Sequence, residues 1–281
     1  MKLASFHHAG RASYGAVVDN GIIDIGSRLG ARAPTLRDAI AGDVLSEIAG
    51  IVAGAQPDVA LSSVSLDLPI PNPSKVILIG RNYRGHVAEA AGKLPEKPSV
   101  FIRALDTFVP HGGKLVRPRI SDNFDYEGEL AFVIGRPARH VTQAAALSYI
   151  AGYTILNDGS IRDYQFTHSL TVGKNFFHSG SIGPWMVTSD EIPDPTQLML
   201  HTRLNQQEVQ HTKTDDLIFD IPFLMEYLSA FIPLVPGDII ATGTPEGVGF
   251  ARKPPLWMKP GDTLEVEISG IGLLRNEVVA E

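Results

Sequence analysis

The sequence predicts a β-rich α+β fold. Short apolar runs bounded by turn residues recur along the chain, which contains 27 Gly and 20 Pro among 281 residues. In the longer C-terminal part, strand candidates outnumber helix candidates, which argues against alternating βα units. The strand candidates are KVILIG, SVFIRA, YEGELAFVIG, GYTILND, GPWMVT, LMLHTRLN, DIIATG, TLEVEIS and GIGLLRNEVV.

A small N-terminal α+β domain is predicted for residues 1–68. Short apolar runs open the chain, and Asn20-Gly21 tolerates the positive φ of a tight hairpin turn. Two stretches with helical spacing follow, with Thr35 and Asp43 as expected N-caps. Alternating prolines in LPIPNPSK then favour extended backbone. We place the domain boundary there and assign residues 69–281 to a second domain.

Three helices are predicted in the second domain. One lies in RGHVAEAAG and one around TQAAALSYIAG. The third runs through DIPFLMEYLSAF, where Asp220 is placed to cap the helix and Pro222 fits its first turn.

Composition excludes several classes of function. The net charge of −7 disfavours binding to nucleic acid or to an anionic membrane. The absence of cysteine removes disulfides, thiolate metal sites and cysteine nucleophiles. The chain has neither a membrane-spanning apolar run nor the apolar stretch of a signal peptide, so a cytoplasmic enzyme is the expectation. ATP-binding, dinucleotide-binding, HExxH and GxSxG motifs are also missing.

Two neighbouring glutamates indicate a site for a hard metal ion. In a strand through YEGELAFVI, Glu127 and Glu129 share one face, roughly 6 to 7 Å apart at the backbone. Apolar residues continue that face, which predicts that the carboxylates are covered and need a cation. Asp158, after the run GYTILN, is a third candidate. Oxygen ligands alone suit Mg²⁺, Mn²⁺ or Ca²⁺. The alternatives are a solvated strand face for the glutamates and a turn or N-cap role for Asp158.

Other polar residues form candidate constellations. His86 and Glu89, three apart on a predicted helix, can together activate a water molecule, although most such pairs are surface contacts. Arg162 offers a fork for a carboxylate, and Lys174 can stabilise an enolate or oxyanion. The alternative for Arg162 is a helical ion pair with Asp158.

Taken in order, these motifs resemble the fumarylacetoacetate hydrolase family, in its acylpyruvate hydrolase and 2-oxo-hept-3-ene-dioate isomerase branch. The similarity covers about residues 69 to 279. The motifs that carry it are PSKVILIGRNYRGHVAEA, DYEGELAFVIG, NDGSIRDYQ, GKNFFHSGSIGPWMV, RLNQQEVQ and PGDIIATGTPEGVG. Two departures are Arg103, where many relatives carry lysine, and Gln206, where an Asn-Gly turn is frequent.

The resemblance implies a set of site residues and a fold. It implies Mg²⁺ or Mn²⁺ bound by three carboxylates, a catalytic set of a His-Glu dyad and a lysine, and three substrate contacts. The metal ligands would be Glu127, Glu129 and Asp158; the catalytic set would be His86, Glu89 and Lys174; the substrate contacts would be Arg162, Gln165 and Thr244. It also implies a roll of mixed β-sheets in a catalytic domain, a small N-terminal domain and a homodimer.

The resemblance also implies a reaction. We expect hydrolytic C–C cleavage of a 2,4-dioxo acid, in which water activated by the dyad attacks the 4-carbonyl and the metal and Lys174 stabilise the resulting pyruvate enolate. Decarboxylation, isomerisation or hydration of a 2-oxo acid would use the same groups. A noncatalytic metal- or sugar-acid-binding module is a further alternative, disfavoured because His86, Glu89 and Lys174 are all present.

Overall fold

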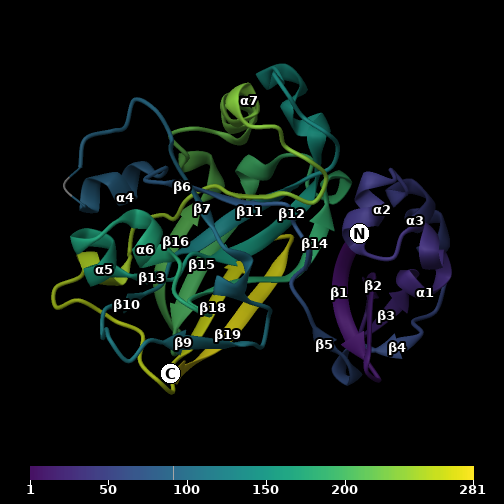
Figure 1. Ribbon diagram of the computed structural model, residues 1–281, viewed down its shortest axis with the longest axis horizontal. Helices are drawn as coiled ribbons and strands as arrows, with labels where there is room; N and C mark the ends of the chain where they lie inside the picture. Colours follow the sequence, from purple (N-terminus) through teal and green to yellow (C-terminus); the bar gives the residue numbers. More distant parts are fainter. Residues whose placement is uncertain (91) are drawn as a thin grey trace.

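The computed structural model describes residues 1–90 and 92–281, and strands dominate it (Figure 1). A twelve-stranded sheet, a five-stranded sheet and a two-stranded ladder account for the strands. This arrangement is the predicted β-rich α+β fold. The five-stranded sheet comprises β16 (Gln207–Lys213), β15 (Met199–Leu204), β18 (Thr263–Ile268), β19 (Gly272–Ala280) and β9 (Lys114–Arg117). The ladder joins β10 (Phe124–Asp125) to β13 (Ser160–Ile161).

The twelve-stranded sheet runs from the N-terminal segment into the body of the molecule. Its main path joins ten strands, and two short strands pair outside that path. The path is β4 (Val59–Ala60), β3 (Gly21–Asp24), β2 (Arg11–Val18), β1 (Lys2–His8), β14 (Gly180–Thr188), β12 (Ile150–Asn157), β11 (Gly128–Ile134), β17 (Ile239–Ala241), β6 (Val76–Gly80) and β7 (Ser99–Arg103). Off the path, β5 (Ser65–Leu66) pairs with β1 and β8 (Phe108–Val109) pairs with β14.

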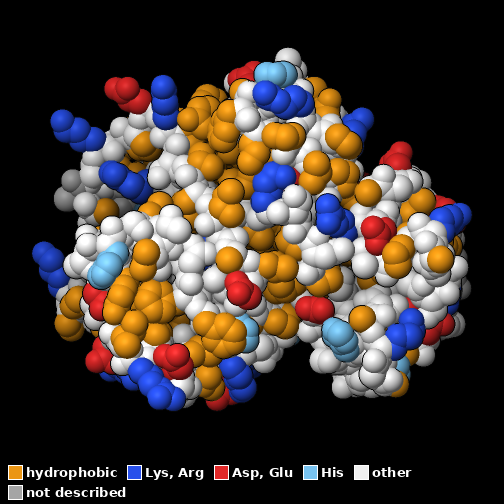
Figure 2. Space-filling model, viewed as in Figure 1, with side chains coloured by type: hydrophobic (Ala, Val, Ile, Leu, Met, Phe, Trp, Pro, Cys, Tyr) orange, Lys and Arg blue, Asp and Glu red, His pale blue; other side chains and the backbone are white. Residues whose placement is uncertain are grey.

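The N-terminal segment forms a small unit at one end of the molecule, coloured purple in Figure 1. The predicted hairpin is present as β2 and β3, and the segment also holds α1 (Ile25–Leu29), α2 (Leu36–Ala41) and α3 (Leu45–Val52). Because β1 pairs with β14, this unit shares a sheet with the body. Figure 2 shows a notch between the two along one edge. The boundary after residue 68 stays a prediction.

Of the two helix caps expected in the N-terminal segment, one is confirmed and one is wrong. Thr35 caps α2 in a capping box with Asp38. Asp43 does not cap α3, whose N-cap is Val44. Asp43 instead takes a left-handed conformation, with φ of 54°, in the turn after Gly42. Aspartate adopts the left-handed conformation more readily than most residues and is also a common N-cap. An aspartate before a predicted helix is therefore compatible with either a cap or a turn.

The helix predicted around TQAAALSYIAG was only partly right. Residues Gln143–Tyr149 form a 3₁₀-helix, and β12 begins at Ile150, which pairs with Ile134. From Ile150 onward the backbone N–H and C=O groups form the ladder with β11, so they are not free to continue a helix. The helix after Asp220 is confirmed as α7 (Ile221–Phe231), with the Asp220 side chain accepting a hydrogen bond from Phe223 N at 2.9 Å.

Strand β11 forms the centre of the molecule, and all seven of its residues are buried. Leu130 and Phe132 pack into a core with α7, whereas Ala131 and Val133 pack into a core shared with the N-terminal unit. The face that carries Glu129 is therefore covered, as the sequence indicated. No helix in the described residues is long and apolar enough to cross a membrane.

Three short helices place polar side chains near the N-terminal end of β11. They are α4 (Arg84–Glu89), α5 (Arg162–Thr167) and α6 (Leu170–Lys174). Helix α4 is the predicted one, whereas α5 and α6 were not predicted. The Ser169 side chain starts α6 by accepting a hydrogen bond from Val172 N.

Candidate active site

The three predicted metal ligands lie together. Oxygens of Glu127, Glu129 and Asp158 approach within 4.8 Å of one another, and all three residues are buried. Glu129 belongs to β11, Glu127 directly precedes that strand and Asp158 directly follows β12. The pairing of Gly128 with Asn157 brings the strand ends together, and a hydrogen bond of 2.8 Å from Asp158 N to Glu127 O closes the corner.

Three buried cations surround these carboxylates. Lys174 Nζ lies 2.5 Å from Glu127 Oε2 and 2.5 Å from Asp158 Oδ2. Arg162 Nη2 lies 2.5 Å from the other oxygen of Glu127. Arg103 Nη1 lies 2.6 Å from Asp158 Oδ1. Two of the three carboxylates are thereby held in place by charged hydrogen bonds, which are the stronger kind.

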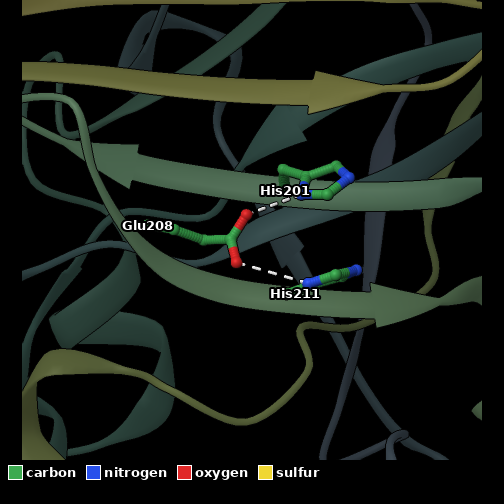
Figure 3. Close-up of side chains that lie close together, drawn as sticks. All are labelled: His201, Glu208 and His211. Carbon is green, nitrogen blue, oxygen red and sulfur yellow. Dashed lines mark hydrogen bonds and ion pairs between the residues drawn. The ribbon is translucent and has the colours of Figure 1, made fainter.

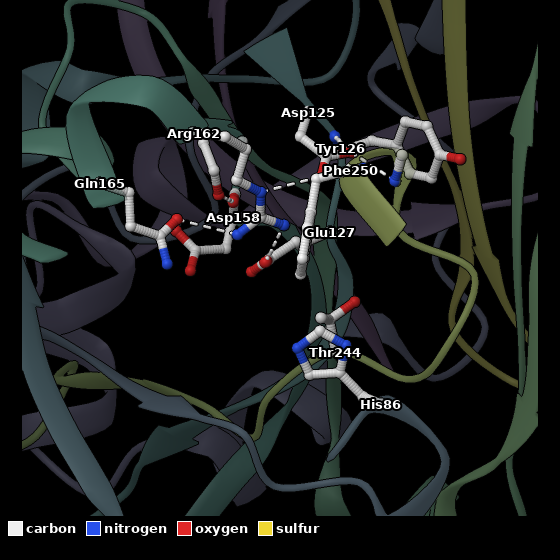
Figure 4. A network of polar contacts seen from close by, with 12 residues as sticks. His86, Asp125, Tyr126, Glu127, Asp158, Arg162, Gln165, Thr244 and Phe250 are labelled. Atoms are coloured by element: carbon white, nitrogen blue, oxygen red, sulfur yellow. Dashed lines mark hydrogen bonds and ion pairs between the residues drawn. The ribbon is translucent and has the colours of Figure 1, made fainter. Parts of the chain in front are cut away.

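A fourth buried acid, Asp125, orients Arg162 (Figure 4). Its Oδ2 lies 2.8 Å from Arg162 Nε, and its two oxygens also accept hydrogen bonds from Gly249 N and Phe250 N at 2.7 and 3.1 Å. Arg162 therefore pairs with Asp125 and Glu127. The alternative of a helical ion pair between Arg162 and Asp158 is wrong, because Asp158 precedes α5 and binds Arg103 and Lys174 instead.

The carboxylates differ in their charge balance. Burial alone would raise the pKa of Glu127, but Arg162 and Lys174 outweigh it and lower that pKa to about 2. The pKa of Glu129 is raised well above its usual value by burial, by Asp158 and by Glu127. Within the described residues, Glu129 accepts one hydrogen bond, from Gly243 N at 2.8 Å. Glu129 is therefore the carboxylate that lacks a cation.

This donor set fits a hard divalent ion. The ligand atoms are all carboxylate oxygens, and an ion shared by the three would supply the positive charge that Glu129 lacks. The four buried acids and three buried cations of the cluster, all taken as ionised, leave one net negative charge. A divalent ion would change that to one net positive charge, which suits an anionic ligand.

The predicted dyad forms at one side of the same cavity. His86 Nδ1 lies 2.9 Å from Glu89 Oε1, and the other oxygen of Glu89 accepts a hydrogen bond from Gly247 N at 2.9 Å. His86 is buried and lines a cavity of about 410 Å³ together with Glu127, Glu129 and Asp158. Figure 4 shows the imidazole across open space from the carboxylates. The surface-contact alternative for His86 is therefore wrong.

Comparison with known proteins identifies the family. The family model for the fumarylacetoacetate (FAA) hydrolase C-terminal region matches residues 75–279. The chain belongs to the fumarylacetoacetate hydrolase family. Members of this family are enzymes, and its known members include hydrolases, isomerases, decarboxylases and tautomerases.

Two curated relatives and one solved structure illustrate that range. The chain is 43% identical over 216 residues to the 4-hydroxyphenylacetate degradation bifunctional isomerase/decarboxylase of Salmonella dublin, covering 76% of this chain and 48% of that protein. It is 40% identical over 224 residues to the oxaloacetate tautomerase YisK of Bacillus subtilis (strain 168), covering 78% and 74%. Maleylpyruvate hydrolase from Sphingobium sp. SYK-6, in complex with manganese(II) and pyruvate, aligns with a TM-score of 0.83 at 30% identity, covering 100% and 99%. The match thus spans about half of the bifunctional enzyme.

The residues expected from the family to contact substrate have different partners. Gln165 lines the cavity, and its Oε1 accepts a hydrogen bond of 2.9 Å from Arg162 Nη1. Thr244 also lines it, but its hydroxyl donates to Gly128 O at 3.0 Å and accepts from Gln210 Nε2 at 2.9 Å. Arg162 is held by two carboxylates. Arg162 and Thr244 are thus tied to the wall of the cavity.

Sequence reasoning missed three residues that build this family site. Arg103 was noted only as a departure from lysine, yet it is buried and binds Asp158, Gly159 O and Ser179 Oγ. Asp125 was not singled out, although it shares the period-two face of Glu127 and Glu129. Gln210 gave no signal, because nothing in QQEVQH marks which glutamine points inward.

Proposed function

We propose that this chain is a divalent-metal-dependent hydrolase that cleaves a C–C bond of a 2,4-dioxo acid of the acylpyruvate type. The observation that carries the proposal is that the carboxylate cluster and His86, whose Nδ1 pairs with Glu89, line one cavity of about 410 Å³. One group of residues is suited to hold a metal ion and the other to activate water. The maleylpyruvate hydrolase structure with manganese(II) and pyruvate supports it.

The His86–Glu89 pair has the geometry of a general base. With Glu89 ionised, the His86 Nδ1–H group donates a hydrogen bond to Glu89 Oε1, and the second imidazole nitrogen is left unprotonated. That nitrogen accepts a proton from water as the water oxygen bonds to the 4-carbonyl carbon. The Gly247 N–H donates a hydrogen bond to the other oxygen of Glu89 and holds that carboxylate in place. The imidazole is therefore oriented before substrate arrives.

Bond cleavage then releases a carboxylic acid and the enolate of pyruvate. A divalent ion held by Glu127, Glu129 and Asp158, Mg²⁺ or Mn²⁺ with Ca²⁺ as a third candidate, would supply Lewis-acid chemistry at the 2-oxo group. Lys174 places its ammonium beside the same carboxylates and stabilises the developing enolate charge. Protonated His86 returns its proton to the enolate carbon, which yields pyruvate and restores the base. The Gln165 amide N–H₂ is available to bind the substrate carboxylate from the wall opposite His86.

Enol–keto isomerisation or decarboxylation of a 2-oxo diacid is the second candidate. The observation that favours it is the similarity, at 40 to 43% identity, to an isomerase/decarboxylase and to an oxaloacetate tautomerase. These reactions also pass charge to a 2-oxo acid enolate, and they use His86 to move a proton without adding water to the carbon chain.

The test is incubation of the purified protein with Mg²⁺ or Mn²⁺ and three substrate classes: acylpyruvates, oxaloacetate and unsaturated 2-oxo diacids. The hydrolase proposal predicts pyruvate and a second carboxylic acid in equal amounts, with one ¹⁸O atom from labelled water in the second acid. Release of CO₂ without a second acid, or loss of the enol absorbance without cleavage, would instead establish the second candidate.

Variants connect the activity to the site. Glu127→Gln removes a charge from the ligand set, and we expect a loss of turnover of at least a hundredfold together with weaker Mn²⁺ binding. Glu277→Gln is the matched control, because Glu277 is half-exposed on β19 and pairs with Lys114. Full metal-dependent turnover in Glu127→Gln would show that the reaction does not use this cluster.

A further inference from the structure

A second group of potential metal ligands lies outside the active-site cavity, on the hairpin of β15 and β16. His201 projects from β15, and Glu208 and His211 project from β16 (Figure 3). One ligand atom from each lies within 4.8 Å of the others. The side chains of His201, Glu208 and His211 are 26, 46 and 50% exposed, so the group is open to solvent.

A β-bulge brings the three side chains to one face. His201 and His211 are direct cross-strand partners. Glu208 lies three residues before His211, an odd separation that puts two side chains on opposite faces of a regular strand. The register shifts between Thr202 and Arg203, so that β16 contains one extra residue there. The bulge reverses the alternation and turns Glu208 to the same face as His211.

The backbone that carries the group is fixed from both sides. At the turn, Asn205 and Gln206 both adopt positive φ, of 52° and 68°, which matches the twist of a two-residue hairpin. On the inner face, Gln210 is buried and its amide donates hydrogen bonds to Thr244 Oγ1 and Pro245 O at 2.9 and 3.1 Å. The cluster is therefore mounted on an ordered hairpin, which lowers the entropic cost of collecting three ligands.

The distances within the group approach those of a tetrahedral metal site. His201 Nδ1 lies 2.8 Å from Glu208 Oε2, and His211 Nδ1 lies 3.3 Å from Glu208 Oε1. Ligand atoms about 2.0 to 2.2 Å from a tetrahedral zinc ion lie about 3.3 to 3.6 Å apart. The two imidazole rings are 4.4 Å apart between centroids. Small rotations of exposed side chains would suffice to admit an ion.

Neighbouring charges leave these ligands available. Arg203 is the cross-strand partner of Glu208, yet its Nη1 binds Glu267 of β18 at 2.7 Å. Lys213, two residues beyond His211, binds Asp215 at 2.9 Å. Glu208 therefore has the two imidazoles as its ion-pair partners in the described structure.

We propose that His201, Glu208 and His211 form a surface site for one Zn²⁺ ion, with solvent completing the coordination. Two imidazoles and one carboxylate suit Zn²⁺, Ni²⁺ or Cu²⁺, whereas Mg²⁺ prefers oxygen ligands. The site is thus chemically distinct from the carboxylate cluster, and it does not depend on the proposed reaction.

The test is equilibrium dialysis of Zn²⁺ with the full chain, in excess Mg²⁺, followed by elemental analysis. We expect His201→Ala/His211→Ala to bind one Zn²⁺ fewer per chain than the wild type, and Glu208→Gln to bind this ion at least tenfold more weakly. His7→Ala is the matched control, because His7 is a half-exposed strand histidine with a single acidic partner, Asp67. It should retain the full zinc content.

Two further readouts establish that the loss of zinc is local to the hairpin. Far-UV circular dichroism and turnover with Mg²⁺ should be the same in the double variant and in the wild type, which shows that the fold and the active site are intact. Equal zinc content and affinity in the double variant and the wild type would overturn the proposal, and so would an equal loss in His7→Ala.

Discussion

Two clusters of three potential metal ligands occur in the described part of this chain, and they differ in how their charges are compensated. Glu127, Glu129 and Asp158 are buried, whereas His201, Glu208 and His211 face solvent. Burial makes an unpaired charge costly, and the buried cluster is accordingly surrounded by charged side chains from four other elements. Solvent screens the charges of the exposed cluster, and no comparable set of charged side chains from other elements surrounds it in the described residues.

Burial, more than ligand number, therefore determines how much surrounding structure a site requires. Arg103 comes from β7, Lys174 from α6, Arg162 from α5 and Asp125 from β10. Each contributes to a single network around two strand ends. The surface cluster depends on one hairpin and one bulge. Changes to supporting residues should consequently have large effects at the first cluster and small effects at the second.

The largest effect is expected for Arg103→Met. It removes the 2.6 Å contact to Asp158 Oδ1 and leaves a buried carboxylate with Lys174 as its remaining cation. Breaking a buried pair from one side costs about 3 to 5 kcal/mol of unfolding free energy. Urea denaturation measures this loss, and turnover should fall with it.

Arg203→Met is the matched surface control for that variant. Arg203 and Glu267 are 28 and 43% exposed, and a pair of that kind contributes at most about 1 kcal/mol. Equal losses of stability for the two arginine variants would contradict the role of burial in separating the two clusters.

A smaller effect is expected for Gln210→Leu, which acts on the buried cluster through the backbone. Gln210 Oε1 accepts a hydrogen bond of 3.0 Å from Gly128 N, the peptide between two proposed metal ligands. Leucine leaves that buried N–H without its partner, at a cost of about 1 to 3 kcal/mol. Mn²⁺ titration followed by electron paramagnetic resonance should show weaker binding. Gln207→Leu, on the exposed end of the same strand, should leave both stability and Mn²⁺ affinity unchanged.

The sequence predicted the carboxylates of the buried cluster better than the charged residues that hold them in place. Strand periodicity placed Glu129 on a covered face, and the motif order of the family identified Asp158 and the dyad. Arg103 illustrates what pattern reasoning lacks, because its partner Asp158 is 55 residues away in the chain, and the strand that carries Arg103 and the strand that precedes Asp158, β7 and β12, are not neighbours in the sheet. Family motifs show which residues recur, whereas charge balance depends on contacts between elements.

The surface cluster was not predicted for a different physical reason. A strand register without a bulge puts Glu208 and His211 on opposite faces, so periodicity argues against the site that the structure contains. A bulge adds one residue to one strand, and the letters RLNQQEVQ do not determine where that residue is inserted. Neither His201 nor His211 lies at a spacing that suggests a shared ligand set.

The smallest effect is expected for His211→Ala in metal-free buffer. Its half-exposed ring contacts Glu208 at 3.3 Å and lies 4.4 Å from the His201 ring, and surface contacts of this kind contribute little, so the urea midpoint should match that of the wild type. Added Zn²⁺ should then raise the midpoint of the wild type but not that of His211→Ala. An ion that binds only the folded state stabilises it by an amount that grows with the logarithm of the ion concentration relative to its dissociation constant. Arg103→Met should show the same zinc-dependent increase in the urea midpoint as the wild type, although its midpoint without zinc is lower. If Zn²⁺ did not raise the midpoint of Arg103→Met, the two clusters would be coupled through the sheet, and the contrast between independent buried and exposed sites would no longer hold.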